Sequence, residues 1–187
     1  MDNLAEFQSF PKMARLSREC VITEKIDGTN AQVVVMEDGT VRAGSRNRWI
    51  TKEADNFGFA AWVEANTEEL RRLGPGRHFG EWWGAGIQRR YGLTEKRFSL
   101  FAVHRYADNP PPRCCHLVPV LFSGLFSTDA VDEVMLDLTI RGSQAAPGWL
   151  DPEGVIIYHT AAKVAFKRTF EGDAEGKDRH AWEVANA

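Results

Sequence analysis

Lys25 stands at the end of a predicted strand that contains the apolar pair Val21-Ile22, and the polar turn Asp27-Gly28 begins two residues after it. This placement fits a nucleophile better than a solubilising surface charge. The ordinary pKa of lysine is about 10.4, so only a small fraction of the amine is uncharged at neutral pH. A reactive lysine therefore needs desolvation or a neighbouring positive charge that lowers its pKa.

A lysine-rich segment, residues 163–167, supplies such a neighbouring charge. In a strand, Lys163, Ala165 and Lys167 share one face, and the small Ala165 leaves room beside the lysines for a bound phosphate. Taken alone, the segment fits an ordinary edge strand with solvated lysines better than a phosphate site.

Two glutamates lie in patterns that suit a nucleotide and its metal ion. Strand alternation places Glu81 beside the aromatic Phe79 and Trp83, where its carboxylate can accept from a ribose hydroxyl or hold a structural hydrogen bond. Glu153 stands just before the apolar run 155–157, where a ligand of Mg²⁺ or of its water shell would sit. A plain turn before a strand is the alternative for Glu153.

An arginine and an aromatic residue complete the set of chemically informative positions. Arg46 lies in the segment 44–48, and its planar guanidinium can grip phosphate oxygens. An exposed basic hairpin end has the same pattern. Phe101 belongs to a predicted strand, where an aromatic side chain can pack in the core or form the floor of a purine pocket.

The order of these clusters is more specific than any one of them. Lysine-x-aspartate-glycine, arginine, glycine-glutamate, an aromatic strand, glutamate-glycine and a lysine strand follow one another as in the covalent nucleotidyltransferases, the superfamily of ligases and capping enzymes. Within it the chain most resembles the RNA ligase 2 family of phages and kinetoplastid editing ligases. The segments that carry the resemblance are 25–30 (motif I, with the trailing Thr29-Asn30), 79–81 (motif III), 84–88 (the stretch that follows motif III in phage members), Phe101 (motif IIIa), 153–154 (motif IV) and 164–167 (motif V).

This resemblance implies a fold and an activity. The fold is an α+β nucleotidyltransferase domain, similar to ATP-grasp ligases, of two antiparallel sheets with flanking helices. The activity is ATP-dependent RNA ligation. AMP is first bound to Lys25, then passes to a 5′-phosphate, and a 3′-hydroxyl finally displaces it. Lys167 would act on the α-phosphate, and Glu153 would act on Mg²⁺ or Mn²⁺.

The resemblance also implies a set of nucleotide contacts. Glu24 would read the adenine edge, Phe101 would stack on the base, and Glu81 would bind the ribose. Arg46 would contact phosphate or ribose, and Asn30 the activated end in a later step. The full set expected at the nucleotide is Glu24, Ile26, Asn30, Arg46, Glu81, Phe101 and Lys163.

The chain departs from the family pattern at Thr169, where motif V has a second lysine. Lys163 is expected to substitute for it, since Arg168 points to the other face of the strand. A single domain over residues 1–187 is expected, with a polar tail over 171–187 and no OB domain or helical C-terminal domain. Two alternatives stay open: a capping-like transferase that does not seal, and a nucleotide-binding module without catalysis.

The periodicity predicts the elements that position these residues. Strands are expected at 20–26, 31–36, 40–45, 77–83, 98–105, 116–122, 154–159 and 163–168. One helix is expected within 59–73, before Gly74, and another from Ser127 or Thr128 to just before Gly142. This pattern indicates an α+β fold with mostly antiparallel sheets and helices packed outside them.

Composition limits the function further. With 187 residues, of which 43% are hydrophobic, the chain can form a packed core. A net charge of −3 argues against binding nucleic acid by bulk electrostatics. RNA would therefore need a local basic surface, such as Arg42, Arg46, Arg48 and Lys52, or Arg89 and Arg90.

The sequence also predicts where the protein is found. It has three cysteines without a disulfide pattern, no apolar segment long enough to span a membrane and no signal peptide. These features predict a cytoplasmic protein without a membrane or disulfide-linked partner.

Overall fold

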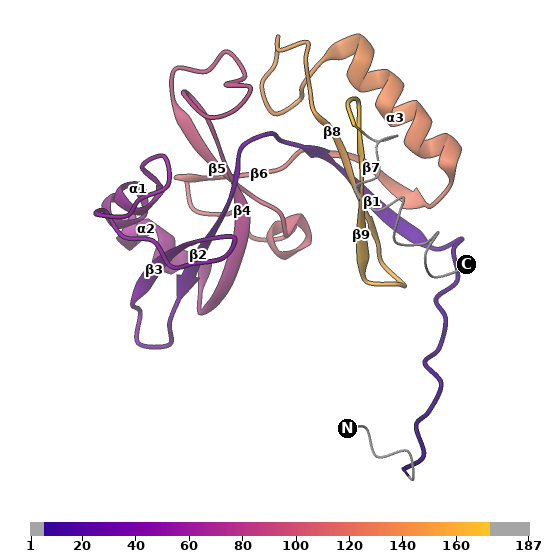
Figure 1. Ribbon diagram of the computed structural model, residues 1–187, viewed down its shortest axis with the longest axis horizontal. Coiled ribbons are helices and arrows are strands. Elements are labelled where there is room, and N and C mark those ends of the chain that lie inside the picture. The colour runs from indigo at the N-terminus through magenta and orange to yellow at the C-terminus, as the bar shows by residue number, and fades with distance from the viewer. Residues whose placement is uncertain (1–5, 173–187) are drawn as a thin grey trace, which may run out of the picture.

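The computed structural model describes residues 6–172 and shows two β-sheets side by side, each covered by helices on one face (Figure 1). Sheet A contains β1 (Glu19–Lys25), β7 (Val120–Leu125), β8 (Gly154–His159) and β9 (Val164–Thr169), in the order β7-β1-β8-β9. Sheet B contains β2 (Thr29–Val35), β3 (Val41–Ser45), β4 (Gly76–Gly84), β5 (Lys96–Leu100) and β6 (Cys115–Leu117), in the order β3-β2-β4-β5-β6. Only the β5–β6 pair is parallel among these strands, so the predicted α+β fold is confirmed.

The helices bury the apolar face of each sheet. Sheet B is covered by α1 (Phe59–Ala65), α2 (Thr67–Leu70) and a 3₁₀ helix (Arg71–Leu73), and Phe59, Trp82 and Phe98 meet in the core between them. Sheet A is covered by α3 (Thr128–Arg141), whose Val131, Val134, Met135 and Leu138 pack on Ile22 and Ile157. A further 3₁₀ helix spans Val103–Tyr106.

The chain crosses between the sheets twice, and a third core lies at the crossings. Residues 26–28 lead from β1 to β2, and residues 118–119 lead from β6 to β7. Ile26 and Val118, one from each crossing, pack together with Trp83, Tyr91 and Ala146. This cluster joins the two sheets close to the end of β1, which carries Lys25.

Several predicted elements differ from the observed ones. The strand predicted over 116–122 is two strands in different sheets, β6 and β7, because Pro119 has no N–H for a continuous ladder. The strand predicted over 98–105 ends at Leu100 and is followed by the 3₁₀ helix. The helix predicted within 59–73 is broken at Asn66, whose side chain donates to the backbone oxygen of Trp62 at 2.8 Å and competes with the regular helix bonds.

Two local predictions are confirmed, the hairpin between β2 and β3 and the start of α3. The hairpin at Glu37-Asp38-Gly39 joins β2 to β3, with Gly39 at φ +80°. The helix expected to begin near Ser127 is α3, and Ser127 caps it by accepting from the N–H of Ala130 at 3.1 Å. Cys20, Cys114 and Cys115 are free thiols. Within residues 6–172 no helix is long and apolar enough to span a bilayer. Most of the tail expected over 171–187 lies outside the described residues.

Candidate active site

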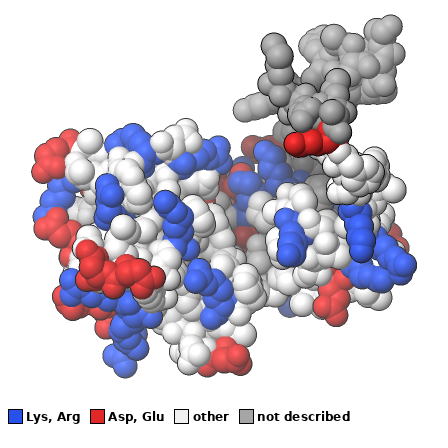
Figure 2. All heavy atoms as spheres, turned by 90° about the horizontal axis from the view of Figure 1, so that it is seen from below, with Lys and Arg blue, Asp and Glu red and all other residues white. Residues whose placement is uncertain are grey.

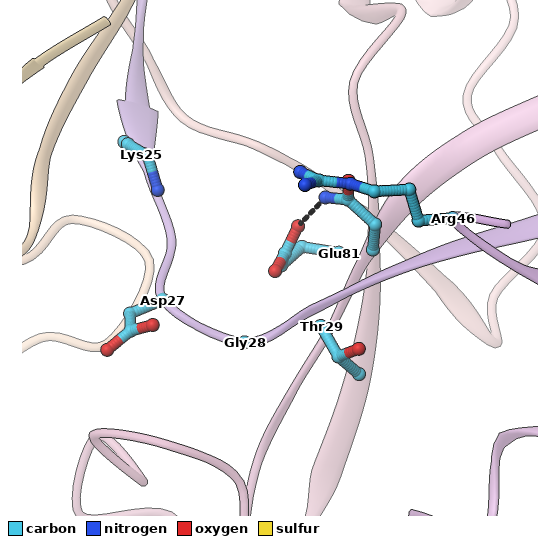
Figure 3. Close-up of a pocket in the computed structure, with 7 residues that line it drawn as sticks. Lys25, Asp27, Gly28, Thr29, Arg46 and Glu81 are labelled. Carbon is cyan, nitrogen blue, oxygen red and sulfur yellow. Dashed lines mark hydrogen bonds between the residues drawn. The ribbon is translucent and has the colours of Figure 1, made fainter. Parts of the chain in front are cut away.

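A hollow of about 360 Å³ opens where β1 leaves sheet A and β2 enters sheet B. In the view from below, it lies between two lobes whose walls show both basic and acidic side chains (Figure 2). Lys25 projects from one side, while Glu81 and Arg46 lie on the opposite side (Figure 3). The complete lining is Lys25, Asp27, Gly28, Thr29, Asn30, Arg46 and Glu81. Residues from both sheets therefore form one polar cavity.

Lys25 and Glu153 form an ion pair at the sheet A side of this cavity. Lys25 pairs with Gly154 across β1 and β8, which brings the preceding Glu153 alongside it. The Lys25 Nζ donates to Oε1 of Glu153 at 2.5 Å, and the two side chains are only 24% and 19% exposed. The second carboxylate oxygen, Oε2, is buried and has no hydrogen-bond partner within the described residues. Glu153 thus has one oxygen on the lysine and one acceptor still free for a ligand.

Two glycines permit the close approaches that build this geometry. A Cβ at Gly28 would lie 2.5 Å from the carbonyl oxygen of Trp82 and 2.7 Å from Cβ of Trp83. A Cβ at Gly154, where φ is +145°, would lie 2.2 Å from the carbonyl oxygen of Arg168. No side chain fits at either position. The motif glycines are therefore required by packing against β4 and β9.

A chain of hydrogen bonds fixes the sheet B side of the cavity. Arg46 Nε donates to Oδ1 of Asn30 at 2.9 Å, and Nδ2 of Asn30 donates to Oε2 of Glu81 at 3.0 Å. Cross-strand pairing of Asn30 with Glu81 places the two side chains on one face. Glu81 is only 7% exposed. Burial raises the pKa of its carboxyl to about 7, although the hydrogen bond from Asn30 and the charge of Lys25 act in the opposite direction.

Arg89 forms an ion cluster that sequence reasoning missed. Its Nε lies 3.2 Å from Oδ2 of Asp27, and its terminal nitrogens lie 2.5 Å from Asp151 and 3.4 Å from Glu171. The Arg89 side chain is only 17% exposed. The N–H of Asp27 also donates to the hydroxyl of Tyr91 at 2.7 Å. Arg89 was predicted as part of an exposed basic surface; instead it ties the turn after Lys25 to the segment before Glu153.

Two residues expected at the nucleotide lie elsewhere. The carboxylate of Glu24 is on the opposite face of β1 from Lys25, is 1% exposed, and accepts from Ser143 Oγ at 2.5 Å and from the N–H groups of Gln144 and Ala145 at 2.8 and 2.9 Å. Burial raises its pKa despite these donors. Ile26 packs in the core at the crossings. Neither side chain reaches the cavity, because alternation along β1 turns Glu24 toward the 143–146 loop.

Lys163 and Lys167 lie at different places on the β8–β9 hairpin, one in its turn and the other within β9. Lys163 lies in the turn before β9 with φ +54°, at the opposite end of the β8–β9 pair from Gly154, so it cannot substitute for a second motif V lysine. Lys167 pairs with Ile156, which in turn pairs with Thr23, and therefore shares the sheet face of Lys25. Thr169 pairs with Gly154 directly beside Lys25. Arg168 points to the other face, as expected, and forms an ion pair with Asp132 of α3.

Phe101 lies just beyond β5, and its N–H donates to the carbonyl oxygen of Phe79 at 3.0 Å. Its ring is exposed, as is that of Phe79. The pairing of β4 with β5 places both aromatic residues on the face that carries Glu81. The structure therefore places Phe101 outside the core.

A metal ion held by protein side chains alone is not supported. Within residues 6–172, no group of three or more His, Cys, Asp and Glu side chains is arranged to hold an ion. Any ion would use Glu153 together with oxygen atoms of a substrate or of water, as is usual for Mg²⁺.

Comparisons with known proteins bear on the fold and the family. Curated proteins gave no significant sequence match. Among solved structures, an apo mutant of the Naegleria gruberi RNA ligase matches with TM-score 0.61 and 20% identity over 88% of this chain and 53% of the ligase chain. The same ligase with pyrophosphate matches with TM-score 0.58 and 20% identity over 95% and 61%. A mutant with ATP and manganese gives TM-score 0.58 and 19% identity over 87% and 53%.

These structural matches establish the fold. The chain spans about half the length of the solved ligases that it matches. The sequence itself matches the profile of the family described as RNA ligase over residues 18–170, which is most of its length. The protein therefore belongs to the RNA ligase family.

Proposed function

We propose that the chain is the nucleotidyltransferase domain of an ATP-dependent RNA ligase, and that Lys25 carries AMP during the reaction. The observation that carries this proposal is the placement of Lys25 against Glu153, at the mouth of a cavity that Arg46, Asn30 and Glu81 close on the other side. Binding of ATP and manganese by a solved relative of the same fold supports it. The free cysteines suit a reducing compartment, and we propose a cytoplasmic location.

In the first step, Nζ of Lys25 forms a bond to the α-phosphorus of ATP. The bond from this phosphorus to the bridging oxygen breaks, and its electron pair leaves with pyrophosphate. Lys25 must first lose a proton, and Oε1 of Glu153 at 2.5 Å is placed to accept it. The proton that remains on nitrogen after attack passes to water, which reaches the part-exposed side chain.

The other residues hold the nucleotide in line for this attack. Glu81 would accept from a ribose hydroxyl, Arg46 would bind phosphate oxygens, and Phe101 would stack on the adenine. Lys167 would neutralise charge on the α-phosphate from the face that it shares with Lys25. Bound Mg²⁺ or Mn²⁺ would neutralise charge that develops on the phosphate oxygens. The unpaired Oε2 of Glu153 fits such an ion.

Two further steps would complete ligation. A 5′-phosphate oxygen of the RNA attacks the phosphorus of the AMP on Lys25. The phosphorus–nitrogen bond breaks, and its electron pair returns to Nζ of Lys25, which takes up a proton from solvent. The 3′-hydroxyl of the second end then attacks the activated 5′-phosphate. This forms the phosphodiester and releases AMP, and the hydroxyl proton passes to solvent.

Self-labelling tests the first step directly. Protein incubated with ATP labelled at the α-phosphate and Mg²⁺, then denatured, should retain the label, and Lys25→Ala should retain none. Lys163→Ala is the matched control, because this exposed lysine lies at the far end of the β8–β9 hairpin. Absence of label on the wild-type protein, or equal label on Lys25→Ala, would contradict the proposal.

One observation favours a transferase that does not seal. Thr169, the residue of β9 nearest to Lys25 by strand pairing, is uncharged, and its hydroxyl donates to the carbonyl oxygen of Glu171 at 2.8 Å. With Lys167 as the only cation on this face of β9, less positive charge would stabilise the phosphates during AMP transfer to RNA and sealing than with two lysines. Nicked RNA, single-stranded RNA and 5′-triphosphate RNA, each offered with ATP or GTP, separate the two functions. Sealed product supports the ligase, and a capped or adenylated end without sealing supports the transferase.

A further inference from the structure

Strand pairing arranges the face of sheet B opposite α1 in rows that lead away from the cavity. The rows, counted outward, are Asn30–Glu81, then Gln32–Phe79 with Gly44, then Val34–Arg77 with Arg42. Successive rows lie two residues apart, or about 7 Å. The third row therefore lies about 14 Å from the row that lines the cavity. A mononucleotide in the cavity would leave this outer row free for another part of a larger substrate.

The outer row carries an arginine–tryptophan platform, which we define as Arg42, Arg77 and Trp49. The guanidinium carbon of Arg42 lies 4.1 Å from the ring centre of Trp49, and that of Arg77 lies 5.6 Å from it. These distances are typical of cation–π contacts. The indole is itself exposed, as is the neighbouring Phe79 of the second row. Cationic and aromatic groups thus alternate over this face.

The two arginines of the platform lack carboxylate partners. Within residues 6–172, ion pairs with acidic side chains involve six arginines, of which Arg97 alone lies on sheet B, at β5 and beside its partner Glu95: Arg71, Arg72, Arg89, Arg97, Arg141 and Arg168. Within the same residues Arg42, Arg46, Arg48, Arg77 and Arg105 have no acidic side chain within ion-pair distance. The whole chain has net charge −3, so this uncompensated charge is local.

The arginine and aromatic side chains of this face are suited to a ligand that carries both phosphates and unpaired bases. A guanidinium binds phosphate oxygens in bidentate fashion, and exposed indole and phenyl faces stack on unpaired bases. An extended single strand offers both groups in alternation, whereas an acidic peptide would leave the rings uncovered. In a duplex the bases are already stacked on one another and are not available to these rings.

We propose that the arginine–tryptophan platform binds a single-stranded segment of the polynucleotide whose end lies in the cavity. Phosphates of this segment contact Arg42 and Arg77, and a base stacks on Trp49. The strand then runs over Phe79 toward Glu81 and Lys25. This inference rests on the proposed function only in that the cavity is the place where the polynucleotide end reacts.

Fluorescence anisotropy with a 5′-phosphorylated single-stranded oligoribonucleotide tests the platform. The double variant Arg42→Ala/Arg77→Ala should bind more weakly, and the slope of log K against log salt should become shallower by about 0.7 for each arginine removed. Arg42→Lys keeps the charge and loses the planar stack, so its salt slope should stay close to that of the wild type. Arg141→Ala on α3 removes the same charge far from sheet B and should change neither quantity.

Three outcomes would overturn the platform. These are an unchanged salt slope in the double variant, an equal loss in Arg141→Ala, or competition by polyglutamate as effective as that by unlabelled oligoribonucleotide. ATP affinity measured on the same proteins distinguishes a nucleotide role, because equal losses for ATP and for the oligoribonucleotide would assign both arginines to the cavity. Oligoribonucleotide binding needs no reaction at Lys25. A failure of self-labelling would therefore contradict the proposed function, while the anisotropy measurement would still decide whether the platform binds RNA.

Discussion

The amine of Lys25 lies 2.5 Å from a carboxylate oxygen of Glu153, a residue 128 positions later in the chain. The contact is fixed by the register of β1 on β8, which pairs Lys25 with Gly154. Because side chains alternate between faces, a shift of one residue would send Lys25 to the side that packs on α3. The geometry of the nucleophile therefore depends on strand pairing as much as on local sequence.

Replacing Glu153 by Gln should slow self-labelling by about 100-fold or more, because an amide cannot accept the lysine proton. The change is nearly isosteric, so the fold should be kept. Single-turnover release of pyrophosphate measures the rate. Glu37→Gln in the exposed β2–β3 hairpin is the control and should behave as wild type. A wild-type rate for Glu153→Gln would remove Glu153 from the chemistry.

Removing the side chain of Arg89 should lower both stability and labelling. Arg89→Met leaves Asp27 and Asp151 without their shared cation, at a cost of about 1–3 kcal/mol in the free energy of unfolding. The neighbouring Arg90 is exposed, and Arg90→Met is a matched control. Urea denaturation measures the difference between the two variants. Equal stability of both would show that the ion cluster contributes nothing.

Gly28→Ala should destabilise the protein by about 1–3 kcal/mol, the usual cost of overpacking. The added methyl would meet the backbone of Trp82 and the side chain of Trp83, which belong to a buried strand and cannot move cheaply. The crossing would have to shift away from β4, taking Lys25 away from Glu81. Thermal denaturation and self-labelling should both be affected. A variant with wild-type stability would argue against this close approach.

Glu81 should make stability depend on pH between about 4.5 and about 7. Its pKa is raised from 4.5 to about 7 by folding, so within this interval the folded protein binds more protons than the unfolded chain. The contribution of Glu81 to stability therefore falls as pH rises, by at most about 1.4 kcal/mol per pH unit. Glu81→Gln should remove this slope, as seen in urea midpoints across the interval. An identical pH profile for both proteins would show that the carboxyl is not perturbed.

The sequence predicted the architecture well because its signals are local. An apolar run marked β8, turn residues marked the β2–β3 hairpin, and Ser127 marked the start of α3. The motif order also led to the residues around the cavity, including Lys25, Asn30 and Glu81, whose individual roles stay predictions. What could be predicted was residue type, spacing and strand face.

Long-range contacts explain what the sequence did not predict. Lys163 was treated as a strand residue, but the tight β8–β9 hairpin requires it in the turn. The family resemblance assigned Glu24 to the adenine, yet its hydrogen-bond partners come from a loop far along the chain. Nothing in the sequence around Arg89 shows that it meets Asp27, Asp151 and Glu171, because that contact exists only after both sheets have formed.

The walls of the cavity belong to different sheets, and each sheet has its own core. The distance from Lys25 to Glu81, and with it the width of the cavity, therefore depends on how the two sheets pack together at Ile26 and Val118. Substitutions at this joint can change catalytic alignment without touching a single reacting group. Loss of activity in distant core variants would then reflect a changed angle between the lobes rather than a damaged site.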